Sequence, residues 1–300
     1  GFGHNLVAVV GAGLLFGIGY GIFDTNNMPI LCQFVSHKQR ATAYGVMNMI
    51  GVSAGAAYGV SMASKQPRRN LDVLMKYRND KRYLGLSNMI DKDNKSIYGL
   101  EFSYETIPNE LNLFDYDAFK QYKGDFYCVV TNLLTGQPEY MKYTGDDRTN
   151  TVLKATCALP MLFPPIIIND VPYMDGGLSD SIPYLKAIED GCDRIIVVLT
   201  RQSGYTKTTS RSTKAIAYSY RNQYPKLTET MLTRASRYNE SLKGLDQYVK
   251  EGRIITIQPT TSKGFSRLEK DKNKILSMYN DGYNQCYELL DTIKEFYEIK

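Results

Sequence analysis

A serine between two glycines is the residue of this chain best suited to nucleophilic chemistry. Residues 51–55 have the sequence Gly-Val-Ser-Ala-Gly, with Ser53 at the centre. This pattern is typical of a nucleophile elbow, in which the serine lies on a sharp turn from a strand to a helix. A serine hydroxyl attacks an acyl carbonyl efficiently only when a base takes its proton. The chemistry of Ser53 therefore depends on a base elsewhere in the chain.

The sequence predicts a carboxylate as that base. The chain contains only two histidines, His4 and His37, and both precede Ser53. In α/β-hydrolases the histidine follows the serine and the acid, so this triad is excluded. Asp175 is followed by two glycines at 176–177, which permit the tight turn that would bring its carboxylate within hydrogen-bond reach of the serine. We therefore predict a Ser–Asp dyad.

A serine hydrolase also needs backbone N–H groups that stabilise the oxyanion of the tetrahedral intermediate. The N–H of Ala54 is one predicted donor, because it lies at the start of the helix after the elbow, where the helix dipole is positive. The second donor is predicted in the turn at residues 11–13, provided that residues 5–10 form a strand. The predicted site comprises Ser53 and Asp175 as catalytic residues, Ala54, Gly11, Ala12 and Gly13 in the oxyanion hole, and Gly51, Gly55, Gly176 and Gly177 as turn glycines.

The composition favours a cytoplasmic protein that does not bind nucleic acid. The net charge is only +5, and the 36 Lys and Arg residues are interspersed with 31 Asp and Glu residues. A nucleic-acid-binding protein instead gathers its basic residues on one face. The five cysteines are scattered and none belongs to a CxxC pair, which predicts reduced thiols rather than a disulfide framework or a zinc site.

The elements that must position the dyad alternate between strand and helix. Strands are predicted at residues 44–50, 126–131, 139–143, 171–174, 194–200 and 254–258. Helices are predicted at residues 54–64, 71–77, 115–122, 151–158, 184–190, 212–250 and 266–298. This alternation indicates α/β layers, and the apolar run at 194–200 is typical of a strand in a parallel sheet.

The first part of the chain carries very little charge. Before Lys65 the only charged residues are Asp24, Lys38 and Arg40. Residues 6–23 are uncharged, mostly apolar and long enough for a membrane-spanning helix. Periodicity alone does not separate such a helix from a buried strand followed by a helix. Both interpretations of the N-terminal segment therefore stay open, and with them a hydrophobic membrane anchor.

From about residue 51 to its end, the chain resembles the patatin-like phospholipases of bacteria. The motifs that carry the resemblance are GVSAGA at 51–56, SKQPRRN at 64–70, FYCVVTNLLTG at 126–136, ATCALP at 155–160, LFPP at 162–165, YMDGGL at 173–178, GCDRIIVVL at 191–199 and SRLEKD at 266–271. The resemblance implies a three-layer α/β/α fold with a mostly parallel central sheet. It also implies Ser53 as nucleophile, Asp175 as base and hydrolysis of lipid acyl esters through an acyl-enzyme, without metal or cofactor.

Residues 17–57 instead resemble two helices of a major facilitator superfamily transporter. The motifs are FDTNNMPILCQ at 23–33 and RATAYGVMN at 40–48. The patatin-like family has a Gly-Gly-Gly-x-Arg-Gly oxyanion loop, and here Leu15 stands where the arginine would be. We therefore predict a hybrid chain. Residues 1–50 form a transporter-like segment in place of the first strand, oxyanion loop and helix, and residues 51–300 form the patatin-like domain. The alternative is a divergent patatin-like N-terminus.

Two functions are consistent with these patterns. The first is an acyl-ester hydrolase, acting as a phospholipase A, a lysophospholipase or an esterase on lipid or acyl-ester substrates at a membrane surface, with a weakened oxyanion hole. The second is a catalytically impaired, membrane-associated lipid-binding protein anchored by residues 6–23. A working transporter is excluded, because two helices cannot build its bundle of inverted repeats.

Overall fold

The computed structural model describes residues 48–66, 68–89, 96, 98–265 and 269–296. The predicted transporter-like segment, apart from its last residues, lies outside this part of the chain. The same holds for the predicted strand at residues 5–10 and for Gly11, Ala12 and Gly13. Within the described residues, no helix combines the length and the apolar character that a membrane crossing requires.

The described elements alternate between strands and helices, as the sequence predicts. In chain order they are β1 (Met49–Val52), α3 (Ala54–Ala63), α4 (Arg69–Tyr77), the 3₁₀ helix η1 (Leu86–Met89), the π-helix η2 (Phe102–Leu111), α5 (Tyr116–Lys120), β2 (Phe126–Asn132), β3 (Pro138–Lys142), α6 (Thr151–Cys157), β4 (Ile166–Ile168), β5 (Val171–Asp175), the 3₁₀ turn η3 (Gly176–Leu178), α7 (Tyr184–Glu189), β6 (Ile195–Val198), α8 (Arg211–Ser219), α9 (Pro225–Lys250), β7 (Ile254–Ile257), α10 (Lys272–Glu288) and α11 (Leu290–Phe296). The α/β fold class is therefore confirmed.

The strands in the described part of the chain form one five-stranded and one two-stranded sheet. Strand β1 pairs parallel with β2, and β6 pairs parallel with β7. Strand β2 pairs antiparallel with β3 and β5, and β4 pairs antiparallel with β5. The antiparallel β2–β3 pair is the predicted hairpin, which turns through Gly136 at a φ of 70°. The sheet is thus mixed, with parallel pairing where β1 leads into the elbow.

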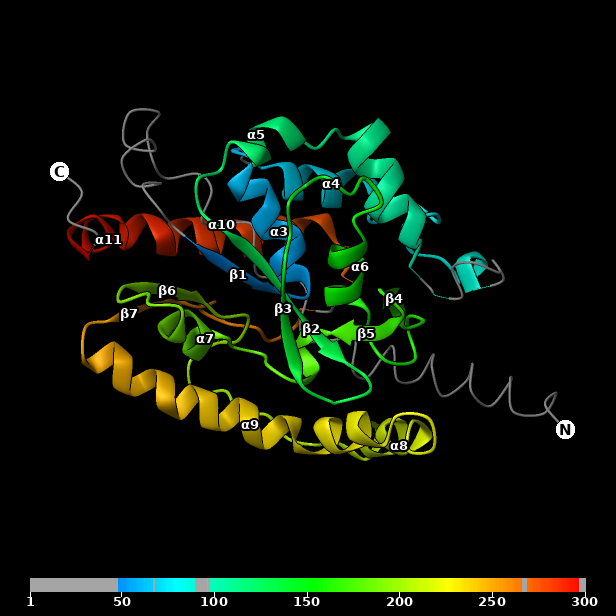
Figure 1. Ribbon diagram of the computed structural model, residues 1–300. Coiled ribbons are helices and arrows are strands. Elements are labelled where there is room, and N and C mark those ends of the chain that lie inside the picture. Colours follow the sequence, from blue (N-terminus) through cyan, green and yellow to red (C-terminus); the bar gives the residue numbers. More distant parts are fainter. Residues whose placement is uncertain (1–47, 67, 90–95, 97, 266–268, 297–300) are drawn as a thin grey trace, which may run out of the picture.

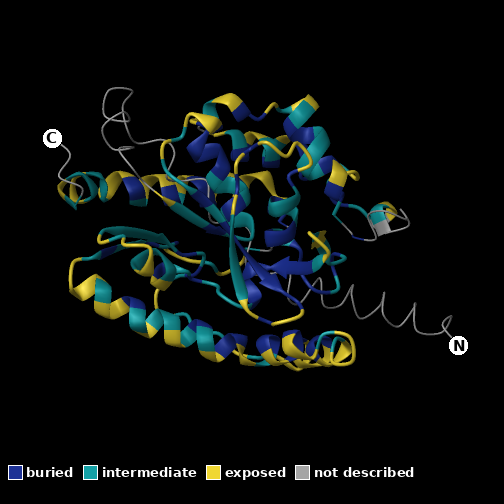
Figure 2. Ribbon diagram, in the orientation of Figure 1, coloured by how far each residue is buried: buried dark blue, intermediate teal, exposed yellow. Residues whose placement is uncertain are grey.

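Helices cover the sheet on two sides (Figure 1). Helices α3, α4 and α10 lie on one side, and α8 and α9 lie on the other. On the first side, Ala56 and Val60 of α3 pack against Phe126 of β2. On the other side, Leu227 and Met231 of α9 share a buried cluster with residues of β5 and η3. Figure 2 shows the result, with buried strands in the middle and exposed residues on the outer face of α9.

The long helical segment predicted at residues 212–250 is two helices in the structure. Helix α8 ends at Ser219, and α9 begins at Pro225. Proline lacks an N–H and disfavours helical backbone in the residue before it, so it suits the first turn of a helix and interrupts one that would run through. Likewise, the segment predicted at 266–298 is divided into α10 and α11.

The start of α3 lies unusually close to the end of β1, and Gly51 makes this approach possible. A Cβ atom at Gly51 would lie 2.5 Å from the Cα of Ala56 and 2.8 Å from its Cβ. A side chain at this position would therefore force the end of β1 and the start of α3 apart. The glycine therefore lets the helix fold back over its own strand directly after the turn.

We expect Gly51→Ala to lower the free energy of unfolding by about 1–3 kcal/mol, as overpacking of a close contact does. Urea denaturation followed by circular dichroism measures this change. Gly252→Asn is the control, because Gly252 has a φ of 71° that Asn tolerates and open space around it. Equal stability losses in the two variants would contradict this account of the β1–α3 contact.

Candidate active site

Ser53 lies on a strained turn between β1 and α3. Its φ is 54° and its ψ is −133°, a region that costs a non-glycine residue on the order of 1–3 kcal/mol. Ser53 is the N-cap position of α3, and Ala54 is the first residue of the helix. The N–H groups of a first helical turn have no partner within the helix. The turn therefore presents the serine hydroxyl beside backbone N–H groups, as the elbow motif predicts.

The structure brings Ser53 and Asp175 into direct contact. The Ser53 hydroxyl donates a hydrogen bond of 2.6 Å to Oδ2 of Asp175, across 122 residues of sequence. A hydroxyl bonded to a carboxylate at this distance has the geometry of a nucleophile and its general base. Asp175 is only 2% exposed, so bulk water competes little for its carboxylate.

Strand β2 sets the distance between the two residues. Val52, the last residue of β1, pairs with Val129 of β2, and Asp175, the last residue of β5, pairs with the adjacent Val130. Because β5 runs antiparallel to β2 while β1 runs parallel to it, the carboxyl ends of β1 and β5 point toward each other. The two turns that follow these ends therefore meet at one place on the sheet.

The second oxygen of Asp175 is also held. Its Oδ1 accepts a hydrogen bond of 2.7 Å from the backbone N–H of Gly177. The backbone N–H of Asp175 donates to the carbonyl of Ala158 at 2.8 Å, and its carbonyl accepts from the Thr131 hydroxyl at 2.8 Å. With both carboxylate oxygens bonded and the backbone fixed, Oδ2 faces the serine in one orientation.

The glycines after Asp175 are required by close packing. A Cβ atom at Gly176 would lie 2.1 Å from the carbonyl oxygen of Val129, so a larger residue would push the turn off β2. A Cβ atom at Gly177 would lie 3.0 Å from Oδ1 of Asp175. Both glycines therefore allow the turn to sit directly on the sheet beside the carboxylate.

Thr156 on α6 holds the elbow itself, and sequence reasoning missed it. The backbone N–H of Ser53 donates to Thr156 Oγ1 at 3.0 Å, and the Thr156 hydroxyl donates to the Val129 carbonyl at 2.6 Å. Thr156 is fully buried. It lies in the ATCALP motif at 155–160, but a lone threonine on a helix carries no chemical signature. This bond occupies the Ser53 N–H, so the role of Ala54 as an oxyanion donor stays a prediction.

The cysteine next to the site is not a rival nucleophile. Burial raises the pKa of Cys157 to about 12, although its hydrogen bond with Tyr104 opposes the shift, and the charge of Asp175 adds to it. Since the thiolate rather than the thiol is the nucleophile, Cys157 stays unreactive near neutral pH. In the described part of the chain, no three His, Cys, Asp or Glu residues are grouped as a metal site would require.

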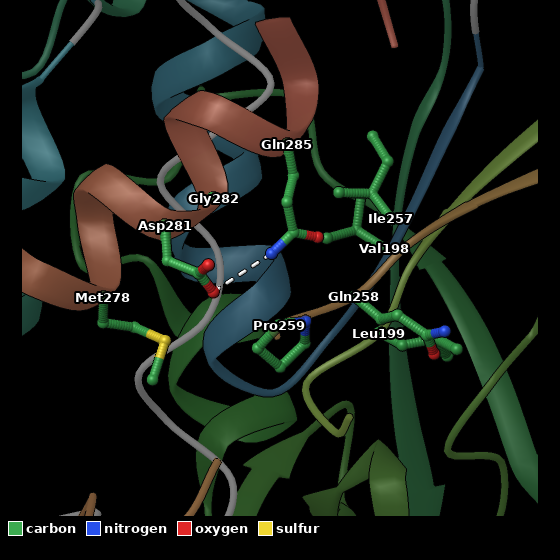
Figure 3. A pocket seen from close by; sticks show the side chains of 9 residues that line it. All are labelled: Val198, Leu199, Ile257, Gln258, Pro259, Met278, Asp281, Gly282 and Gln285. Atoms are coloured by element: carbon green, nitrogen blue, oxygen red, sulfur yellow. Dashed lines mark hydrogen bonds between the residues drawn. The ribbon is translucent and has the colours of Figure 1, made fainter. Parts of the chain in front are cut away.

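A small cavity elsewhere in the fold is separate from the dyad (Figure 3). It lies between the ends of β6 and β7 and helix α10, and neither Ser53 nor Asp175 lines it. Two of its polar side chains, Asp281 and Gln285, bond to each other and to Thr260 in the adjacent loop. Gln285 donates to Asp281 at 3.0 Å, and Asp281 also accepts from the Thr260 hydroxyl at 2.7 Å. Because these side chains already bond to each other and to the loop, we assign them no role in the chemistry at Ser53.

The remaining predicted residues divide into two groups. Gly51, Ala54, Gly176 and Gly177 lie at the turns around the dyad, and Gly55 is the second residue of α3. Gly11, Ala12 and Gly13, the predicted source of the second oxyanion donor, lie outside the described residues. Their place in an oxyanion hole stays a prediction.

Comparison with known proteins identifies two regions of the chain. Residues 42–188, which include Ser53 and Asp175, match the family model of the patatin-like phospholipases. Residues 224–298 match a model described as a domain of unknown function, DUF6363, and this region starts with helix α9. The predicted resemblance to the patatin-like phospholipases is therefore confirmed over residues 42–188.

A curated relative covers part of the chain. The chain is 25% identical over 162 residues to "Uncharacterized protein YjjU" of Escherichia coli (strain K12). The match covers 50% of this chain and 42% of that protein. The chain thus matches less than half the length of this relative, whose printed name assigns no activity.

We expect Thr156→Val to lower the free energy of unfolding by about 1–3 kcal/mol, because it leaves the Ser53 N–H without its acceptor. Urea denaturation followed by circular dichroism is the measurement. Thr156→Ser is the matched control. It keeps the hydroxyl and removes one methyl group, which costs about 1 kcal/mol. A serine variant as unstable as the valine variant would show that packing, not the hydrogen bond, holds the elbow.

Proposed function

Because the chain belongs to the patatin-like phospholipase family over residues 42–188, we propose that it hydrolyses acyl esters of lipids with Ser53 as nucleophile and Asp175 as general base. The observation that carries the proposal is the 2.6 Å hydrogen bond from the Ser53 hydroxyl to the Asp175 carboxylate. The burial of Asp175 and the bond from Gly177 to its other oxygen support the assignment.

In the first half of the reaction, Ser53 Oγ attacks the acyl carbonyl carbon while its proton passes to Asp175 Oδ2. The carbonyl oxygen becomes an oxyanion. The Ala54 N–H and the positive end of α3 stabilise it. The carbonyl then re-forms, the ester C–O bond breaks, and the leaving alkoxide takes the proton from Asp175. The product of this half is an acyl-Ser53 enzyme and a free alcohol.

In the second half, Asp175 serves as base for water. A water molecule gives a proton to Asp175 and attacks the acyl carbon, and a second oxyanion forms in the same place. When this intermediate collapses, Ser53 Oγ leaves and recovers the proton from Asp175. The acid product departs and the dyad returns to its starting state. Each proton that Asp175 accepts is returned within the same half-reaction, so no further base is needed.

The finer features of the activity are part of the same proposal. Phospholipids, lysophospholipids and simple acyl esters are the proposed substrates, met at a membrane surface by a cytoplasmic protein. The second oxyanion donor is proposed at Gly11 to Gly13. Since Leu15 stands where the family loop has arginine, and loss of one oxyanion donor costs about 10²–10³-fold in rate, we expect slow turnover. The proposed domain spans residues 51–300.

The test is hydrolysis of p-nitrophenyl butyrate together with labelling by a fluorophosphonate probe. We expect the wild-type protein to do both. Ser53→Ala removes the nucleophile and abolishes both signals. Asp175→Asn keeps the shape of the side chain but removes the base, and it lowers turnover by about 10³–10⁴-fold. Circular dichroism spectra of the variants show whether the fold is retained.

Exposed residues of the same types supply the controls. Ser277→Ala on α10 and Asp246→Asn on α9 change surface positions away from the dyad, and both should retain wild-type rates. If Ser53→Ala hydrolyses and labels like the wild type, the proposed function is wrong. A wild-type protein that binds lipid vesicles but neither labels nor hydrolyses would favour the impaired, lipid-binding alternative.

A further inference from the structure

Two arginines of helix α9 bind the turn that follows Asp175. Arg234 Nε donates to the Gly177 carbonyl at 2.5 Å. Arg237 Nη2 donates to the Leu178 carbonyl at 2.7 Å, and Arg237 Nε donates to the Ser179 carbonyl at 3.3 Å. Three successive carbonyls are therefore held by guanidinium groups from one helix. Arg234 is only 6% exposed.

These bonds connect α9 to the dyad. Arg234 holds the carbonyl of Gly177, and the N–H of Gly177 holds Oδ1 of Asp175 at 2.7 Å. The other carboxylate oxygen, Oδ2, accepts from the Ser53 hydroxyl. A continuous path of hydrogen bonds and one glycine residue therefore runs from the helix to the nucleophile. A displacement of Gly177 would move the N–H donor that orients the carboxylate.

The guanidinium group of Arg234 is also close to the carboxylate in space. A Cβ atom at Gly177 would lie 3.0 Å from Asp175 Oδ1 and 3.4 Å from Arg234 Nη2. Both groups thus border the α-carbon of Gly177. Arg234 therefore places a positive charge next to the base. The charge of Asp175 also acts on the thiol of Cys157 on α6.

The turn needs such support because it is short. It consists of the three residues of η3, and isolated 3₁₀ turns of this length have poor hydrogen-bond geometry. Helix α9 is a firm platform for it. The Thr230 hydroxyl donates to the Gly136 carbonyl at 2.7 Å, and Leu227 and Met231 are buried in the cluster that contains Met174 and Leu178.

A helix that merely covered the sheet would use apolar side chains at these positions. Taking a guanidinium group out of water costs several kcal/mol, and apolar replacements of buried ionic groups are often neutral or stabilising. Arg234 is nevertheless buried, and its Nε bonds the turn. The charge and donor geometry at this position therefore serve the turn rather than the packing of the helix.

We propose that Arg234 is a positioning residue for Asp175, and that the segment at residues 224–298 contributes helix α9 as a clamp on the turn after the catalytic acid. Arg237 completes the clamp on the next two carbonyls. The inference rests on the proposed acyl hydrolysis, and it gives this C-terminal segment a role in that reaction.

The test compares Arg234→Gln and Arg234→Lys with Lys243→Gln, an exposed control on the same helix with the same charge change as the glutamine variant. We expect Arg234→Gln to lower kcat for p-nitrophenyl butyrate and the rate of fluorophosphonate labelling by about 10–100-fold, as a small misplacement of a catalytic group does, while KM changes less than about twofold. Arg234→Lys keeps the buried charge, so the variant should fold. Because lysine lacks the Nε donor to the Gly177 carbonyl, the variant should lose most of the rate of labelling and turnover. Lys243→Gln should match the wild type.

Hydrogen exchange measured by mass spectrometry supplies a readout that needs no activity. In both Arg234 variants the peptide covering residues 173–182 should exchange faster than in the wild type, while other peptides remain unchanged. Guanidinium at millimolar concentration should partly restore the labelling rate of Arg234→Ala. Labelling of Arg234→Gln within twofold of the wild type, or faster exchange across the whole protein, would overturn the positioning role.

The two proposals fail in different ways. If the wild-type protein neither labels nor hydrolyses, the proposed function is wrong, and exchange of residues 173–182 then decides the clamp alone. Unchanged exchange in that peptide would overturn the clamp, and local acceleration would support it. If the wild type is active and the Arg234 variants are equally active, only the clamp is wrong.

Discussion

The hydrogen bond of 2.6 Å between Ser53 and Asp175 is the constraint that the surrounding structure satisfies. It joins residues 122 positions apart, and it requires two turns to bring these side chains within hydrogen-bond distance. Strand β2 provides the frame, because its adjacent residues Val129 and Val130 pair with the ends of β1 and β5. Gly51 and Gly176 have no Cβ atom, and a Cβ atom at either position would clash with the neighbouring backbone and force the turns apart.

Each member of the dyad is fixed by its own layer of helices. On one side of the sheet, Thr156 of α6 bonds the Ser53 N–H and ties it to the Val129 carbonyl. On the other side, Arg234 of α9 bonds the turn that carries Asp175. Ser53 is thus held by a neutral hydroxyl, and the turn after Asp175 by a buried cation. In the proposed reaction, in which no histidine takes part, the rate depends on this fixed orientation of the carboxylate toward the serine.

Local signals in the sequence were enough to predict that Ser53 and Asp175 lie in contact. The Gly-Val-Ser-Ala-Gly pattern located the turn at Ser53, the absence of a later histidine indicated an acid as base, and the Gly-Gly pair indicated which aspartate has a tight turn. Thr156 and Arg234 were beyond such reasoning, because their partners lie 103 and 57 residues away and leave no pattern in nearby sequence. Pro225 is a local signal for the break between α8 and α9, but the helical pattern on both sides of it led to the prediction of one continuous segment. The oxyanion turn at residues 11–13 lies outside the described residues and stays a prediction.

The central claim is that Ser53 carries the acyl group during turnover. Its most direct test is to mix the wild-type protein with p-nitrophenyl butyrate, quench it in acid during turnover and locate the butyryl group by peptide mass spectrometry. The account predicts a butyryl ester on the peptide that contains Ser53, and none on that peptide in Asp175→Asn quenched at the same time. Ester turnover with the acyl group on another residue, or equal acylation of the two proteins, would contradict it.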